Sequence, residues 1–272
     1  MTDIEKKYSK WENELKCKYA KIFEDAAYTI FDGVVAPSIY SEQRCKIMVI
    51  NREPYDDEGN SYSLNEILKQ QIEGNIRIFS SQLNFRRHLS QELAVLSLLA
   101  EEEFYKKTYE DVTKIVEQLD DDDFSKQIYK VAYTNIKKSD GVNGSSLADL
   151  RKYAKRGWDI ITEQIRFYNP SVIIGGNIVD GLLGSLPGEM ICWGENLFAQ
   201  GTGVNICQIE VAGQYFPFFD LYHPSASSFK DKKSGNTISM DDYYLRIFDA
   251  MKAVLKEHPD YWQKRLNRVC FV

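Results

Sequence analysis

Several common features are missing from this sequence, and each absence narrows the class of protein. No apolar run approaches the roughly 20 residues of a membrane-spanning helix, so we expect no membrane partner. The first residues, MTDIEKKYSKWENELK, contain no signal-peptide-like apolar segment, which favours a cytoplasmic protein. The five cysteines form no CxxC pair and no His–Cys metal spacing, so we expect reduced thiols, mostly in the core.

Positive charge is not in excess either. The formal net charge is −6, which argues mildly against an indiscriminate nucleic-acid binder but leaves room for a local basic groove. The sequence has no internal repeat and no low-complexity segment. Its 272 residues, 43% hydrophobic and 27% charged, have the composition of an ordinary globular protein with a sizeable core. We expect one large domain, or one domain with an insertion.

Apolar runs and amphipathic stretches alternate along the chain. We expect strands at 45–50, 127–135 and 171–176, and a hairpin or two adjoining strands at 204–223, turned near Gly213. We expect helices at 4–25, 88–118 (one or two helices), 145–170 and 239–257. This order predicts a three-layer α/β/α fold with a central, mostly parallel four-stranded sheet. The acidic run 120–123 is interpreted as a solvated connection rather than a metal site, because adjacent carboxylates repel one another.

Polar side chains follow each expected strand. In such folds the ligand lies outside the carboxyl ends of the strands, so these side chains should share one rim. They are Glu53, Tyr55, Asn135, Asn177, His223 and Ser225. Taken singly, each has a plainer interpretation: Glu53 could cap a helix, and an asparagine favours turns, which we prefer for Asn177. Polar groups at four strand ends are more than packing requires, which favours a functional site.

The ordered motifs resemble those of the uracil-DNA glycosylase superfamily. The chain has EPY at 53–55 after an apolar strand, Asn135 after a second strand, glycine at the end of a third, and HPSASS at 223–228. The resemblance covers roughly residues 45–250. It implies a single uracil-DNA-glycosylase-like domain over 1–272, with an N-terminal helix at about 4–25 and a helical insertion at about 88–125. It also implies base excision repair: hydrolysis of the N-glycosidic bond of uracil or another damaged base in DNA.

The resemblance assigns roles to individual residues. Glu53 would orient the attacking water, in a position where the best-known family members have aspartate. Tyr55 would lie beside C5 of the base and exclude the methyl group of thymine. Asn135 would bind the Watson–Crick edge of the flipped base. His223 would donate a hydrogen bond to O2 of the departing uracil anion, and Ser225 would help to hold a DNA phosphate.

The segment after His223 is a candidate DNA-binding loop. It contains Ser228, the apolar wedge candidate Phe229, and three lysines, Lys230, Lys232 and Lys233. A flexible basic loop without such a role is an equally weighted alternative. A second basic group, Lys137 and Lys138, could join Lys152, Lys155 and Arg156 in a phosphate-facing rim.

The sequence departs from the family pattern at Asn51 and Arg52, where members commonly have small or amide residues. An arginine there could disturb the usual geometry or bind a phosphate, which leaves the substrate open. The cysteine spacing does not match that of members with an iron–sulfur cluster, so we expect no cofactor. Two alternatives remain: a catalytically inactive nucleic-acid or nucleotide-binding module of the same fold, and a hydrolase of free nucleosides or nucleotides.

Overall fold

The computed structural model describes most of the chain, and the structural statements below concern that part. The described residues are 1–24, 29–53, 61–74, 80–139, 146–178, 190–192, 205–223, 228–231 and 233–259. Four strand ends predicted from the sequence fall within these ranges, which allows the expected rim to be located.

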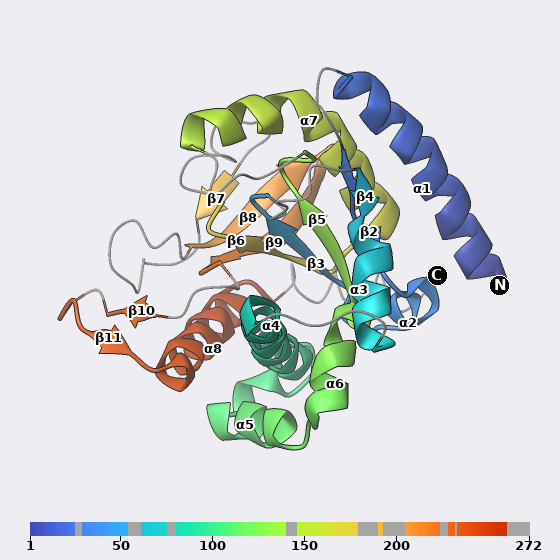
Figure 1. The fold of residues 1–272 in the computed structure, drawn as a ribbon. Helices are drawn as coiled ribbons and strands as arrows, with labels where there is room; N and C mark the ends of the chain where they lie inside the picture. Colours follow the sequence, from blue (N-terminus) through green and yellow to red (C-terminus); the bar gives the residue numbers. More distant parts are fainter. Residues whose placement is uncertain are drawn as a thin grey trace.

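A mixed, mostly parallel sheet forms the centre of the molecule (Figure 1). Its order is β2 (Gly33–Val34), β5 (Val131–Asn135), β3 (Ile47–Asn51), β6 (Val172–Gly176), β9 (Gln214–Leu221), β8 (Asn205–Val211) and β7 (Met190–Cys192). The four central strands, β5, β3, β6 and β9, are parallel to one another. Strands β2 and β8 run antiparallel to β5 and β9, and β7 is antiparallel to β8.

The predicted α/β class is confirmed, but the predicted count of four strands is wrong. The four central strands correspond to the expected ones, and the hairpin is β8–β9, turned at Ala212 and Gly213, both with positive φ. The additional edge strands, β2 and β7, have only two and three residues. Strands this short are not long enough to show the alternation of apolar and polar residues from which a strand is predicted. Two further pairs lie outside the sheet: β1 (Ile30–Phe31) with β4 (Tyr62–Ser63), and β10 (Phe229–Lys230) with β11 (Thr237–Ile238).

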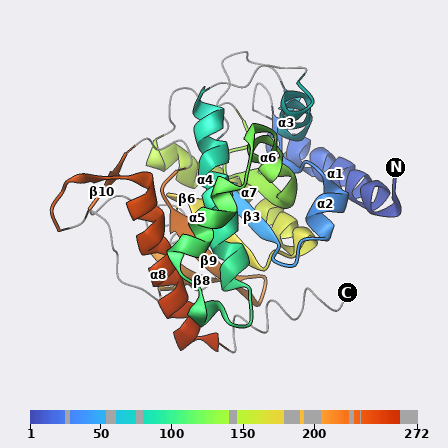
Figure 2. The same ribbon diagram turned by 90° about the horizontal axis from the view of Figure 1, so that it is seen from below.

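Helices flank both faces of the sheet (Figures 1 and 2). One face is covered by α1 (Asp3–Ile22), α2 (Pro37–Ser41) and α7 (Leu147–Tyr168). The other is covered by α4 (Ser80–Leu99), α5 (Tyr109–Glu117) and α8 (Met240–Glu257). The shorter elements are α3 (Leu64–Ile72), η1 (Phe104–Lys106), α6 (Asp121–Lys126) and η2 (Gln127–Lys130). No helix in the described ranges is long and apolar enough to cross a membrane.

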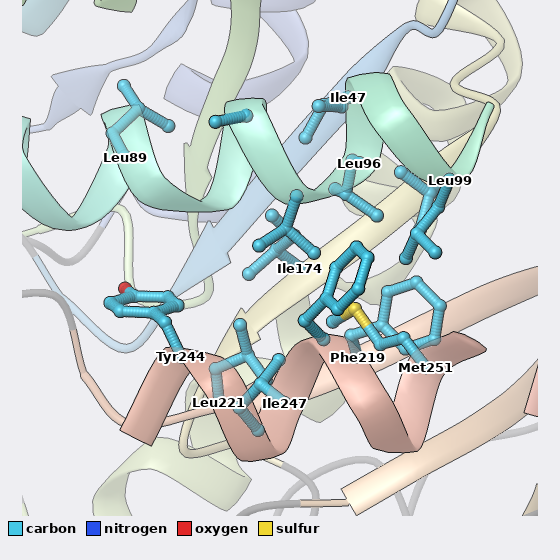
Figure 3. Packing of buried hydrophobic residues seen from close by; sticks show 14 of the residues in the cluster. Ile47, Leu89, Leu96, Leu99, Ile174, Phe219, Leu221, Tyr244, Ile247 and Met251 are labelled. Carbon is cyan, nitrogen blue, oxygen red and sulfur yellow. The ribbon is translucent and has the colours of Figure 1, made fainter. Parts of the chain in front are cut away.

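Successive side chains of a strand point to opposite faces of the sheet, so the hydrophobic core has two halves, one on each face. On β3, Ile47 and Val49 contribute to the cluster beneath α4 and α8, whereas Met48 and Ile50 contribute to the cluster beneath α7. Figure 3 shows the first half, where side chains of α4, α8 and the sheet interlock. Every residue of β3 is buried; Ile47 to Ile50 form a continuous apolar run, and the first polar residue, Asn51, comes at the end of the strand.

Side-chain caps fix several helix ends. Ser239 accepts a hydrogen bond from the backbone N–H of Asp242 at the start of α8, as its SMDD sequence predicts. The acidic run 120–123 starts helix α6, where Asp120 accepts a hydrogen bond from the backbone N–H of Asp123. This is a structural use of the run, since carboxylates are favourable in the first turn of a helix.

Candidate active site

Polar residues from the central strands gather at the carboxyl edge of the sheet. Asn51 ends β3 and pairs in register with Asn135, which ends β5. Next to them, β6 ends at Gly176, and His223 follows β9 by two residues. All four strand ends lie on the same side of one sheet, as the sequence predicted from their order. This edge is the candidate active site.

Asn51 lies at the centre of this edge. Its side chain is buried, and its Nδ2 donates a hydrogen bond of 2.9 Å to the Tyr133 hydroxyl. Its Oδ1 is also buried but has no hydrogen-bond partner among the described residues. A buried amide oxygen without a partner is costly, so this acceptor is available to a ligand or a water molecule.

Gly176 makes room for that amide. A Cβ atom at this position would lie 2.1 Å from Asn51 Oδ1 and 3.4 Å from His223 Cδ2. Asn51 and His223 therefore both approach the space that a side chain on β6 would occupy. The requirement at position 176 is steric, because the backbone φ is not among the positive values.

Asn135 is oriented by a carboxylate that no sequence motif indicates. Its backbone N–H donates to Asp32 Oδ2 at 2.8 Å, and its Nδ2 donates to the same oxygen at 3.4 Å. The first contact fixes the backbone of Asn135, and the second holds its side-chain amide by the nitrogen. Its Oδ1 is buried and has no hydrogen-bond partner in the described ranges. The structure thus presents two amide oxygens, from Asn51 and Asn135, at neighbouring strand ends.

Asp32 belongs to a fully buried polar network on the α7 side of β5. Lys138 Nζ donates to both carboxylate oxygens, at 2.7 and 2.8 Å, and the Lys138 and Asp32 side chains are 0% and 1% exposed. Thr134 Oγ1 and Gln164 Nε2 each donate to Asp32 Oδ1 at 3.0 Å. Burial lowers the pKa of the Lys138 ammonium, while the Asp32 carboxylate acts in the opposite direction.

This network corrects the expectation of a basic rim. Lys138 cannot face a phosphate, because it is buried and bound to Asp32. Lys137 is 7% exposed, and its Nζ lies 5.0 Å from the centre of the Tyr153 ring. Nothing in the sequence indicates this arrangement, because Asp32 precedes a two-residue strand and is far from Lys138 in the chain.

His223 is half-buried beside Arg52 and Glu53. Burial lowers the pKa of its imidazole, and the charge of Arg52 lowers it further, while Glu53 raises it. The lowered pKa keeps the imidazole neutral near pH 7. Glu53 and His223 each follow a strand end at this edge, and the charge of Glu53 acts on the pKa of His223.

The predicted DNA-binding loop is only partly within the described residues. Tyr55, Ser225 and Lys232 lie outside them. Ser228, Lys230 and Lys233 are exposed on or beside β10 and β11.

Phe229 differs from an exposed wedge. It is 3% exposed, and its ring stacks on Tyr243 with 4.3 Å between ring centroids. It also packs edge-on against Tyr222 and His88, so the observed role of this ring is packing.

Three residues of the site were absent from the predicted set or given another role: Asn51, Asp32 and Gly176. From the sequence, Asn51 is only a departure from the family pattern, although its place at the end of a buried strand is a usable signal. The glycine that ends β6 belongs to a sequence motif, but only the three-dimensional structure shows that it makes room for the Asn51 side chain. For Asp32 the sequence offered no signal.

Within the described ranges, no group of three or more His, Cys, Asp or Glu residues is arranged to hold a metal ion. No family model matches the chain, and no match was found among curated proteins or among solved structures.

Proposed function

We propose that this protein is a uracil-DNA glycosylase-like hydrolase that cleaves the N-glycosidic bond of uracil or another damaged base in DNA. The observation that carries the proposal is the meeting of Asn51, Asn135 and His223 at one sheet edge. Two buried amide oxygens there, from Asn51 and Asn135, have no hydrogen-bond partner among the described residues. On this proposal the whole chain is one three-layer α/β/α domain of the glycosylase type, and helices α4, α5 and α6 make up its insertion.

The reaction needs a cation stabiliser and an anion stabiliser on opposite sides of the breaking bond. As the bond from C1′ to the base nitrogen breaks, its electron pair leaves with the base and positive charge develops on the sugar. Glu53 would stabilise that charge and align a water molecule, whose oxygen adds to C1′ and whose proton is released. His223 would donate a hydrogen bond to the base oxygen, a role that suits a neutral imidazole in a partly buried site.

Base recognition would rest on the oriented amide of Asn135. Asp32 holds the amide nitrogen, so the Oδ1 atom is left to accept a hydrogen bond. The N3–H group of uracil supplies the matching donor, whereas cytosine has no hydrogen at N3. This arrangement favours uracil over cytosine. Asn51 Oδ1 would accept from the attacking water or from a second donor of the base.

The same geometry makes Asn135→Ala a better test than Asn135→Asp. An aspartate would set a second carboxylate against Asp32, which now accepts from the amide nitrogen at 3.4 Å. Repulsion between the two carboxylates would disturb the network and obscure any change of specificity. Alanine removes the amide oxygen without adding charge.

A second candidate function is the hydrolysis of free nucleosides or nucleotides. Two observations favour it. Phe229 is buried and so does not serve as an exposed wedge for opening DNA, and Lys138 is paired with Asp32 and so does not contact a phosphate. Lys230 and Lys233 remain exposed and could contact phosphates of either substrate. Both candidate functions use the same bond-breaking chemistry.

The test is a single-turnover assay of base release from uracil-containing single- and double-stranded oligonucleotides and from deoxyuridine. Wild-type protein should release uracil from at least one of them. Glu53→Gln should lower the rate by about 10²–10⁴-fold, while Glu117→Gln, an exposed substitution at the end of α5, should not. Release from deoxyuridine alone would support the second candidate.

Binding measurements separate an enzyme from a binding module. If wild-type protein binds uracil-containing DNA but produces no abasic site, the proposed catalysis is wrong and the chain is a binding module. If cleavage occurs and Lys233→Ala weakens DNA binding and reduces its salt dependence, the exposed lysine contacts a phosphate.

A further inference from the structure

A second cavity lies beside β2, at the edge of the sheet. Its volume is about 550 Å³, which is within the range of small-molecule sites. Its walls are formed by α1, by the β1–β2 segment with the residues that lead into α2, and by α3. These helices lie on the same side of the molecule in Figures 1 and 2. The wall carries apolar, polar and charged side chains together, which is the mixed lining of a ligand site.

Polar side chains from three helices converge on Gly33, beside this cavity. A Cβ atom on Gly33 would lie 2.2 Å from the Tyr168 hydroxyl, 3.0 Å from Glu12 Oε1 and 3.3 Å from Asn65 Nδ2. Tyr168 belongs to α7, Glu12 to α1 and Asn65 to α3. The glycine therefore leaves room for a hydroxyl, a carboxylate and an amide to meet. Glu12 and Asn65 also line the cavity.

Glu12 brings a half-buried carboxylate to the wall. Its Oε1 accepts a hydrogen bond from the Tyr168 hydroxyl at 3.4 Å, which is long for an O–H···O bond. None of the ion pairs within the described ranges includes Glu12. Lys16 is one turn further along α1, but its Nζ lies over the Phe31 ring, 5.4 Å from the ring centroid. A carboxylate has about four acceptor sites, so the Tyr168 hydroxyl and the nearby backbone N–H of Val34 leave part of that capacity unused.

Asn65 adds a second acceptor without a matching donor. Its Oδ1 is buried and has no hydrogen-bond partner among the described residues. A buried amide oxygen left unpaired costs free energy, so a ligand that donates a hydrogen bond to it removes that cost. Asn65 lies in the first turn of α3, whose start is fixed by the Ser63 side chain, so the amide is carried by a defined element.

The unpaired charge of the wall is net negative. Three of its charged side chains already have partners: Glu5 in the capping box of α1, Asp32 with Lys138, and Lys69 with Glu73 at 3.9 Å. Two carboxylates and one ammonium remain without an ion pair in the described ranges, those of Glu12, Glu66 and Lys16. The cavity therefore offers acceptors and negative charge to a ligand.

A ligand that complements this wall carries a positive donor group and a short apolar part. An ammonium or guanidinium group donates charge-assisted hydrogen bonds to a carboxylate, and the same N–H groups suit an amide oxygen. The apolar part would pack on Leu15, Val34 and Pro37, which also line the cavity. The place of Lys16 Nζ over Phe31 shows that this wall accommodates a cation.

We propose that this cavity binds a small organic cation, a primary amine or a guanidine with a short apolar group, and that Glu12 and Asn65 accept its hydrogen bonds. Lys16 opposes binding through its like charge. The inference does not rest on the proposed function, because Glu12, Asn65 and Lys16 take no part in the base chemistry.

Binding should depend on pH through Glu12. Burial raises the pKa of its carboxyl group to about 7, while Lys16 lowers it. The charged and titratable groups that act on it or line the same cavity are Lys16 and Tyr8 on α1, Asp32 before β2, Tyr168 on α7, and Glu66 and Lys69 on α3. The cation requires the ionised carboxylate, and amines and guanidines stay charged over this range. Affinity should therefore be about tenfold higher at pH 8 than at pH 6.

Calorimetric titration of the wild-type protein at constant ionic strength provides the first test. The probes are n-butylammonium and guanidinium chloride, and n-butanol and urea are their neutral counterparts of similar shape. Both cations should bind, n-butylammonium more tightly because of its apolar chain, and the neutral compounds should not. At pH 6 the binding of each cation should release protons to the buffer, because Glu12 must ionise.

Substitutions assign the binding to the proposed residues. Glu12→Gln should weaken binding of n-butylammonium by about tenfold or more and remove its pH dependence. Asn65→Leu should weaken binding less, because a neutral acceptor is lost, and Lys16→Met should strengthen it. The matched control is Glu14→Gln, an exposed change on the same helix outside the cavity, which should leave the affinity nearly unchanged.

Three results would overturn the inference: wild-type protein that binds the cations no better than their neutral counterparts, an affinity that is the same at pH 6 and pH 8, or an affinity that Glu12→Gln leaves unchanged. The first two comparisons need no variant, so the test stands even if a substitution prevents folding. Uracil release is measured separately, so a failure of the proposed function and a failure of this site are distinguishable.

Discussion

Replacing Asp32 with asparagine should destabilise the protein strongly, although Asp32 is not a strand-end residue. The carboxylate binds Lys138 Nζ through both oxygens, and the two side chains are 1% and 0% exposed. Removing one partner of a buried ion pair leaves an uncompensated charge and typically costs about 3–5 kcal/mol. The variant also weakens the acceptor that holds the Asn135 amide, so base release should fall together with stability.

The stability lost in Asp32→Asn should depend on pH in a defined direction. Burial lowers the pKa of Lys138, and Asp32 opposes that shift. Without Asp32 the folded protein binds the Lys138 proton less tightly than the unfolded chain does. The stability of Asp32→Asn should therefore rise with increasing pH through the range between the two pKa values. Urea unfolding at neutral and at alkaline pH measures both the loss and its recovery.

The matched control is Glu163→Gln, which removes the exposed partner of Lys18 between α7 and α1. An exposed pair of this kind contributes only about 0.2–1 kcal/mol. A second control, Asp32→Asn combined with Lys138→Met, removes the buried charge and should regain part of the stability. If Asp32→Asn is no less stable than Glu163→Gln, the buried network does not have the strength assigned to it.

Three further outcomes are expected. Gly176→Ala should displace the Asn51 amide and suppress base release in a single-turnover assay. In Gly175→Ala the added Cβ would meet Asp220 and Phe218 on the opposite face of the strand. That variant should lose about 1–3 kcal/mol of stability in urea unfolding but keep its activity per folded molecule. The rate of base release should fall only when the pH drops through the lowered pKa of His223, below the usual 6.5; a fall at or above that value in the pH–rate profile would contradict the neutral-donor role. Burial raises the pKa of Glu12 from 4.5 to about 7, so its contribution to stability declines as pH rises through that window, and thermal unfolding of Glu12→Gln should lack that decline.

The sequence predicted the parallel centre of the sheet because its strands are buried on both faces. Runs such as CKIMVI and SVIIGG are continuously apolar and stop abruptly, so both their positions and their carboxyl ends can be read. The edge strands of two and three residues have no such pattern. They are defined by pairing with a neighbour, which a local stretch of sequence does not encode.

The candidate site was predictable where a side chain follows a strand and not where it acts from a distance. Asn135 and His223 were found from their place in the chain. Asp32 is brought to Asn135 by the short β1–β2 segment, and Lys138 is drawn inward by Asp32, so its charge gave the wrong expectation of exposure. The burial of Phe229 follows from aromatic neighbours on α4 and α8 that are distant in sequence.

The most direct test of the central claim is the single-turnover rate of uracil release by His223→Asn, compared with wild type and with His258→Asn. His258 lies at the end of α8, so its replacement should leave the rate unchanged. Asparagine keeps an N–H donor but is shorter than histidine, so the donor no longer reaches the leaving anion, and the rate should fall by about 10²–10³-fold in His223→Asn. Equal rates in all three proteins, or no release by the wild-type protein from any uracil-containing substrate, would contradict a glycosylase site at this edge of the sheet.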